Sequence, residues 1–114
     1  MKMTEDTDET AQPRSMTEWT QERISRWTLE TFGEPRSNLA IAVRANEEMA
    51  ELLRALSLDD WSPYAREEVA DVVITLCRLV TRLEGDMARD INEKMERNLL
   101  RRWSIDSNGL GDHI

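Results

Sequence analysis

The segment from residue 69 to residue 83 constrains the fold most strongly, because its apolar residues cover more than one face of a helix. With successive residues about 100° apart around a helix axis, most of them fall within an arc of roughly 160°. These residues are Val69, Val72, Val73, Leu76, Cys77, Leu79, Val80 and Leu83. Ala70 and Ile74 widen the arc to roughly 220°. One neighbouring helix rarely covers so wide a surface, so we expect this helix to be central in a bundle and also to contact a second subunit.

Capping residues and chain breakers divide the chain into four expected helices. These helices cover about residues 16–31, 38–56, 63–84 and 86–103. Ser15 and Glu18 are spaced as a capping box for the first helix, and Ser37 precedes the second. The third is expected to be capped by Ser62, with Pro63 at its first position, where a missing N–H costs nothing.

The end of the third helix and the chain ends complete the expected organisation. Gly85 is expected to end that helix in the left-handed conformation, and Asp86 can cap the fourth helix. A chain of 114 residues is one domain by length. We expect this domain over residues 15–104, after a disordered acidic segment over residues 1–14 and before a loop-like tail over residues 105–114.

The charge and the distribution of apolar residues exclude several classes of protein. A net charge of −8, from 23 acidic and 15 basic residues, argues against a protein that coats nucleic acid. No apolar segment approaches the roughly 18 residues of a membrane span, and the N-terminus lacks the apolar core of a signal peptide. The single cysteine, Cys77, allows no intramolecular disulfide. We therefore expect a cytoplasmic protein without a membrane or nucleic-acid partner.

Two acidic pairs on successive expected helices indicate a metal site. Glu48 and Glu51 are three residues apart and share a helix face, and so do Glu68 and Asp71. If these helices pair antiparallel across their short connection, four carboxylates converge at one level. Carboxylates ionised at pH 7 repel one another at close range unless a cation lies between them. Hard oxygen ligands favour Mg²⁺, with Mn²⁺ as a possible substitute.

The acidic residues have two other interpretations, a solvated helix surface and a di-iron site. Glutamates three residues apart are common on solvated helix surfaces, and either pair alone indicates no more than that. A di-iron bundle needs Glu-x-x-His on its helices, but the sequence has no histidine before His113.

At these residues the sequence resembles the all-α nucleoside triphosphate pyrophosphohydrolases of the MazG-like and dCTP-pyrophosphatase group. The family pattern Glu-Glu-x-x-Glu, a spacer and Glu-x-x-Asp is similar to residues 47–51 and 68–71 here. Residues 35–39 are similar to the segment that enters the metal helix in the dCTP-pyrophosphatase branch. Residues 92–103 carry a Lys, an Asn one turn later, basic residues and an aromatic, as family members do. The resemblance spans roughly residues 32–103.

The resemblance implies a MazG-like four-helix bundle that hydrolyses a (d)NTP to the monophosphate and pyrophosphate, in a nucleotide house-cleaning role. The metal ligands that it implies are Glu48, Glu51, Glu68 and Asp71. One of these carboxylates, or a neighbour such as Glu47, would activate water, with Glu47 and Glu48 as the candidates. The residues implied for phosphate binding are Lys94 and Asn98, with Arg101 and Arg102 as further candidates.

Aromatic residues are the candidates for contacts with the base of a nucleotide. Family members stack the base on an aromatic residue from the first helix or from the loop after the metal helix, which here suggests Trp27, Phe32 and Trp61. Asn38 could add a hydrogen bond to a base edge. Each aromatic could equally be a core or interface residue.

The sequence is compatible with three functions. The leading one is a Mg²⁺-dependent pyrophosphohydrolase acting as a homodimer or homotetramer. The others are a non-catalytic acidic helical module that binds a basic partner, and a nucleotide-binding regulator that hydrolyses slowly.

Overall fold

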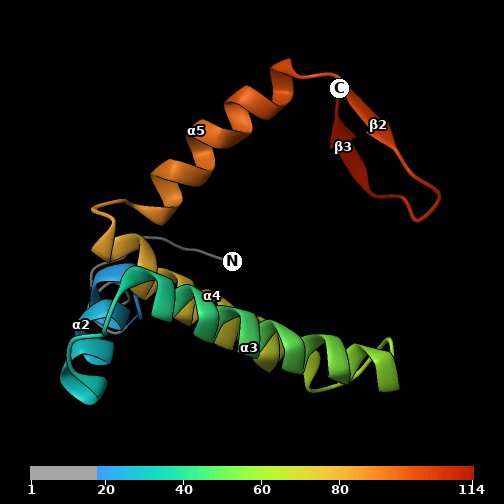
Figure 1. Ribbon diagram of the computed structural model, residues 1–114. Helices are drawn as coiled ribbons and strands as arrows, with labels where there is room; N and C mark the ends of the chain where they lie inside the picture. The colour runs from blue at the N-terminus through green and yellow to red at the C-terminus, as the bar shows by residue number, and fades with distance from the viewer. Residues whose placement is uncertain (1–17) are drawn as a thin grey trace, which may run out of the picture.

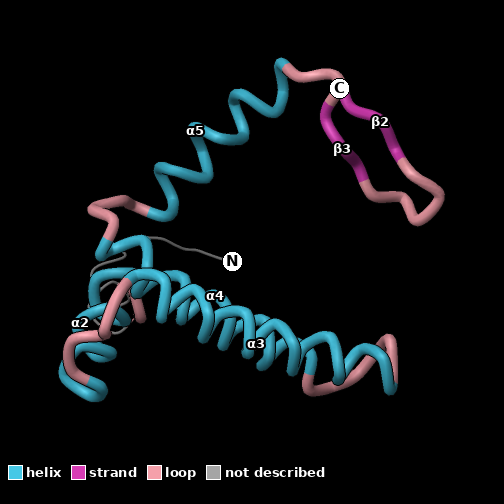
Figure 2. Tube along the Cα trace, in the orientation of Figure 1, coloured by secondary structure: helices cyan, strands magenta, loops and turns pink. Residues whose placement is uncertain are grey.

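The computed structural model describes residues 18–114, and in that part of the chain it contains four α-helices and one two-stranded β-sheet (Figures 1 and 2). The helices are α2 (Gln21–Phe32), α3 (Asn38–Leu58), α4 (Ala65–Arg82) and α5 (Met87–Leu100). The strands are β2 (Trp103–Ile105) and β3 (Gly111–His113). The expected all-α class with four helices is confirmed.

The start of α2 differs from the prediction. Residues 18–20 are not helical, and Thr20 is the N-cap, whose hydroxyl accepts a hydrogen bond from the Arg23 N–H at 3.2 Å. The helix begins where packing begins, because the Gln21 side chain donates to the Thr81 hydroxyl and to the Gly85 carbonyl, both at 3.0 Å. Thr20 is therefore the cap of this helix. The predicted capping box depends on Ser15, which lies outside the described residues.

The starts of α3 and α5 have the predicted caps, whereas the predicted Ser62 cap of α4 is wrong. Ser37 caps α3 by accepting from the Ala40 N–H at 3.0 Å, as expected. Ser62 and Pro63 instead form a turn before α4, in which the Ser62 hydroxyl accepts from the Tyr64 N–H and its carbonyl from the Ala65 N–H. The last of the four predicted helices, α5, is capped by Asp86 as expected.

The left-handed residue after α4 is Glu84, with φ of 61°, so the prediction that Gly85 takes this role was wrong. Gly85 is needed for a different reason. A Cβ atom at this position would lie 2.6 Å from Asp90 Oδ2 and 3.0 Å from Val80 Cγ1. A larger residue at this position would therefore require the Asp90 side chain to move and Val80 to give way.

Helix α4 is central among α2, α3 and α4, as its wide apolar arc predicted (Figure 1). It packs antiparallel against α3 and also contacts α2. The buried residues of this packing are Thr28, Ile41, Glu48, Val72 and Cys77. Polar contacts join α2 to α4, including the Ser25 hydroxyl, which donates to the Cys77 carbonyl at 3.3 Å.

Helix α5 leads away from α2, α3 and α4 and carries the β-hairpin at its far end (Figures 1 and 2). Apolar side chains on α4 and α5 remain exposed in the single chain. They include Val69, Val73, Leu83, Ile91, Met95 and Leu99. None of the helices in residues 18–114 has the length and apolar character that a membrane crossing needs.

The C-terminal hairpin was not predicted from the sequence, where the fourth helix was expected to reach residue 103 and the tail to be a loop. The two strands pair antiparallel, with Trp103 opposite His113 and Ile105 opposite Gly111. Asp106 stabilises the turn, because its Oδ1 accepts from two backbone N–H groups, those of Asn108 and Leu110, at 2.9 Å each. Strands of three residues are too short to show an alternating pattern.

Candidate metal and nucleotide site

The antiparallel packing of α3 and α4 brings three of the predicted carboxylates together. One carboxylate oxygen each from Glu48, Glu68 and Asp71 lies within 4.8 Å of the others. Glu51, one turn after Glu48, lies outside this group of three oxygens but is close enough to Glu68 to affect its pKa. Helix geometry and one short connection therefore bring three of the four predicted carboxylates together, and Glu51 is not in this group.

The environment of these carboxylates fits a divalent cation. The Glu48 side chain is only 7% exposed, and Glu68 Oε2 is buried without a hydrogen-bond partner. Partial burial and the charges of Glu51, Asp71 and Glu48 raise the pKa of Glu68. A buried carboxylate oxygen with no donor is costly, and a hard cation is the ligand that would satisfy it. The donor set, all carboxylate oxygen, suits Mg²⁺ or Mn²⁺.

Arg44 contacts the first acidic motif from the preceding turn of α3. Its Nη2 lies 2.6 Å from Glu48 Oε1, and its Nη1 lies 3.1 Å from Glu47 Oε1. The hydrogen bond to Glu47 and the charge of Glu48 raise the pKa of Arg44. Glu47 is thus paired with a guanidinium on the exposed side, whereas Glu48 faces the other carboxylates.

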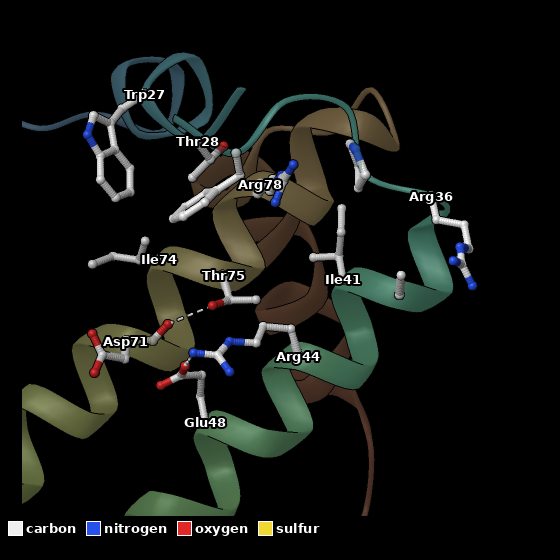
Figure 3. A pocket seen from close by; sticks show the side chains of 13 residues that line it. Trp27, Thr28, Arg36, Ile41, Arg44, Glu48, Asp71, Ile74, Thr75 and Arg78 are labelled. Atoms are coloured by element: carbon white, nitrogen blue, oxygen red, sulfur yellow. Dashed lines mark hydrogen bonds and ion pairs between the residues drawn. The ribbon is translucent and has the colours of Figure 1, made fainter. Parts of the chain in front are cut away.

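A pocket of about 510 Å³ adjoins the carboxylates (Figure 3). Its walls come from α2, the α2–α3 loop, α3 and α4, and Glu48 and Asp71 belong to its lining. The other lining residues are Trp27, Thr28, Phe32, Pro35, Arg36, Ala40, Ile41, Arg44, Ile74, Thr75 and Arg78. The Trp27 and Phe32 rings meet edge to face, with centroids 5.5 Å apart. The pocket therefore joins an apolar, aromatic wall to the group of carboxylates.

Two arginines of α4 hold the α2–α3 loop that forms part of this wall. Arg78 Nη2 donates to the Gly33 carbonyl at 2.6 Å. Arg82 Nε donates to Asn38 Oδ1 at 2.7 Å, and its Nη1 pairs with Glu34 Oε1 at 3.0 Å. Asn38, a predicted base contact, is therefore engaged with Arg82 and does not line the pocket.

The structure separates the other predicted nucleotide contacts into two groups. Trp27 and Phe32 line the pocket, whereas Trp61 is 89% exposed in the loop after α3 and does not. Lys94 and Asn98 lie on α5, and Arg101 and Arg102 follow it. None of these four residues lines the pocket beside the carboxylates in the described chain.

Several residues of the pocket were not identified from the sequence. Arg44 could have been found, because it precedes Glu47 by three residues and Glu48 by four, the spacings that bring side chains together on a helix. Thr75 and Arg78 could have been found in the same way, because they follow Asp71 by four and seven residues on α4. Thr28 gave no such signal, since only the packing of α2 on α4 places it in this pocket.

Comparison with known proteins identifies the fold. No protein-family model and no curated protein matches the sequence. Among solved structures, the chain is similar to the cyanophage S-2L MazG-like pyrophosphohydrolase bound to dGDP and three catalytic Mn²⁺ ions per active site. The two share 29% sequence identity with a TM-score of 0.67, over 82% of this chain and 88% of the phage protein.

The chain has the MazG-like fold. The resemblance predicted from the acidic motifs and the α5 segment is thereby confirmed.

Proposed function

We propose that the protein is a Mg²⁺-dependent nucleoside triphosphate pyrophosphohydrolase, which converts a (d)NTP and water to the (d)NMP and pyrophosphate. The observation that carries the proposal is the group of Glu48, Glu68 and Asp71 oxygens, with the orphaned Glu68 Oε2, at the edge of an aromatic pocket. The MazG-like pyrophosphohydrolase of similar structure is bound to dGDP and Mn²⁺, which supports use of a divalent metal and a nucleotide substrate.

Each part of the site has a chemical task in this reaction. Glu48, Glu51, Glu68 and Asp71 would hold divalent cations, which neutralise phosphate oxygens and polarise the phosphorus atom when bound. Glu47 and Glu48 are the candidates for the base that accepts a proton from the attacking water. Glu48 lies within the group of carboxylate oxygens, where it would meet a water beside the cation. Glu47 is exposed and paired with Arg44, so it would meet a water from the solvent side.

The pocket would receive the nucleoside end of the substrate. Trp27 and Phe32 offer aromatic faces to a base, and Glu48 and Asp71 lie where the pocket meets the proposed metal ligands. A base in the pocket would therefore place the phosphates beside the cations.

We expect Trp27→Ala to raise the KM of the preferred nucleotide roughly tenfold, because stacking contributes about 1–3 kcal/mol per base. The turnover number should change little, since the side chain does not contact the carboxylates. Steady-state kinetics would measure both. Trp61→Ala is the matched control, because Trp61 was also a candidate for stacking but lies outside the pocket. A larger rise in KM for Trp61→Ala than for Trp27→Ala would mean that the base binds outside this pocket.

We also propose that the protein works as a homodimer or homotetramer. A groove of about 390 Å³ between α4 and α5 is lined by Leu76, Val80, Met87, Ile91 and Met95, and α5 packs little against the other helices. A second copy would cover these apolar residues. It would also bring Lys94 and Asn98 to the carboxylates of its neighbour, since α5 leads away from those of its own chain (Figure 1).

The proposal is tested by incubating the protein with a panel of ribo- and deoxyribonucleoside triphosphates and Mg²⁺ or Mn²⁺. The expected products are a nucleoside monophosphate and pyrophosphate, separated by ion-exchange chromatography. Release of inorganic phosphate and a diphosphate would contradict the proposed bond cleavage. Very slow turnover with tight nucleotide binding would instead favour the regulator.

Metal binding has a separate readout. Mg²⁺ or Mn²⁺ at about 100 times its Kd should raise the melting temperature by roughly 10 °C, because a ligand of the native state stabilises it by mass action. Differential scanning fluorimetry over a metal titration measures this shift. Absence of any shift, with or without nucleotide, would favour the non-catalytic interaction module.

A further inference from the structure

Arg44 lies at the junction between the proposed metal ligands and the pocket. It lines the pocket, and its guanidinium is directed at Glu48, as Figure 3 shows. The two side chains differ in exposure, since that of Arg44 is 60% exposed and that of Glu48 only 7%. The guanidinium therefore reaches from the open pocket to a nearly buried carboxylate.

The pairing makes Arg44 a competitor of any metal ion that uses Glu48. Glu48 contributes to the group of three carboxylate oxygens, and its Oε1 also lies 2.6 Å from Arg44 Nη2. A divalent cation withdraws electron density from the carboxylate and repels the guanidinium at short range. Binding of the cation should therefore weaken the contact between Arg44 and Glu48.

In the proposed function, the substrate phosphate is a second partner for a guanidinium released from Glu48. Its planar set of N–H donors matches two oxygens of a phosphate group, and such paired bonds are stronger than those of neutral groups. A nucleotide whose base lies against Trp27 and Phe32 would carry its phosphates past Arg44 on the way to the carboxylates.

We propose that Arg44 binds the substrate phosphate and exchanges Glu48 for it when the divalent cation occupies the site. The proposal rests on the proposed pyrophosphohydrolase function. It makes Arg44 oppose binding of the metal alone and favour binding of the nucleotide with the metal. A guanidinium that served only as a structural partner of Glu47 and Glu48 would not have these opposite effects.

The test measures Mn²⁺ alone and Mn²⁺ with nucleotide on the full chain and its Arg44→Gln variant. Isothermal titration calorimetry should show about threefold tighter Mn²⁺ binding by the variant, because the Arg44 side chain is 60% exposed and solvent weakens its competition for Glu48. With saturating Mn²⁺, an α,β-imido analogue of the best triphosphate should bind the variant at least about tenfold more weakly. Arg44→Lys keeps the charge but loses the paired geometry, so its Mn²⁺ affinity should stay close to wild type while nucleotide binding falls.

Arg36→Gln is the matched control, because Arg36 lines the same pocket but has no ion pair with the acidic motif among the described residues. Its Mn²⁺ affinity should equal that of the wild type. Weaker or unchanged Mn²⁺ binding by Arg44→Gln overturns the exchange, and so does unchanged nucleotide binding. Either result leaves the proposed function standing if the wild type still releases pyrophosphate. A wild type that binds Mn²⁺ but hydrolyses no nucleotide overturns the proposed function. The Mn²⁺ affinities of the wild type and Arg44→Gln still show in that case whether Arg44 competes with the metal for Glu48.

Discussion

Replacing Glu68 by Gln is expected to lower the rate of pyrophosphate release about 1,000-fold. A catalytic cation supplies several kcal/mol of transition-state stabilisation, and each 1.4 kcal/mol or so corresponds to a factor of ten in rate. Gln keeps the shape of the side chain but removes its charge, and Glu68 Oε2 is the buried oxygen without a partner. Asp71→Asn should have a similar effect, because Asp71 belongs to the same group of oxygens. Release of pyrophosphate at saturating nucleotide and metal measures both.

The same Glu68→Gln variant should be somewhat more stable than the wild type when no metal is present. Burial and three neighbouring carboxylates raise the pKa of Glu68, so the folded state holds its proton at pH values where the unfolded state has lost it. Stability from this group therefore falls as the pH rises through the folded-state pKa, and Gln removes the penalty. Thermal unfolding in EDTA should show a higher melting temperature for the variant near neutral pH, which excludes misfolding as the cause of lost activity.

The exposed Glu67 provides a control for both measurements. It precedes Glu68 in the first turn of α4 but is not part of the group of carboxylate oxygens. Glu67→Gln should therefore retain the wild-type rate and the metal-dependent rise in melting temperature. Wild-type turnover in both Glu68→Gln and Asp71→Asn would contradict the assignment of the metal ligands.

The grouping of Glu48, Glu68 and Asp71 could be predicted from the sequence because local geometry produces most of it. Residues three apart share a helix face, and the short connection between α3 and α4 leaves antiparallel packing as the simple arrangement. The burial of Glu48 and the orphaned oxygen of Glu68 could not be predicted, because they depend on how closely the two helices approach.

The pocket and the hairpin show where prediction from the sequence fails. Trp27 and Thr28 line the pocket beside the carboxylates only through the packing of α2 on α4, a tertiary contact that no spacing along the chain encodes. The hairpin depends on hydrogen bonds to the Asp106 side chain and on strands too short to show an alternating pattern. The wide apolar arc of α4 correctly predicted its central position. The expectation that a second subunit covers the rest of this arc stays a prediction.

Mixing two inactive variants is expected to restore activity if each site uses residues of two copies. Lys94→Ala should lose most activity, because a phosphate contact from α5 is removed, and Glu68→Gln should lose nearly all. In a twofold dimer, a mixed pair has one site with the intact carboxylates of the Lys94→Ala chain and the intact Lys94 of the other chain. Half of the randomly formed dimers are mixed and each has one complete site, so the mixture should regain about a quarter of the wild-type rate.

The physical basis of this expectation is the direction of α5. Lys94 lines the groove between α4 and α5 with apolar residues, and it does not line the pocket beside the carboxylates of its own chain. The two variants should be mixed in denaturant, refolded together and assayed for pyrophosphate, with each variant refolded alone as the control. Light scattering on the same samples gives the mass, which should be a multiple of 13.3 kDa. A mixture no more active than the two variants alone, in a sample shown to be oligomeric, would mean that each chain completes its own site and that α5 must bend back to reach it.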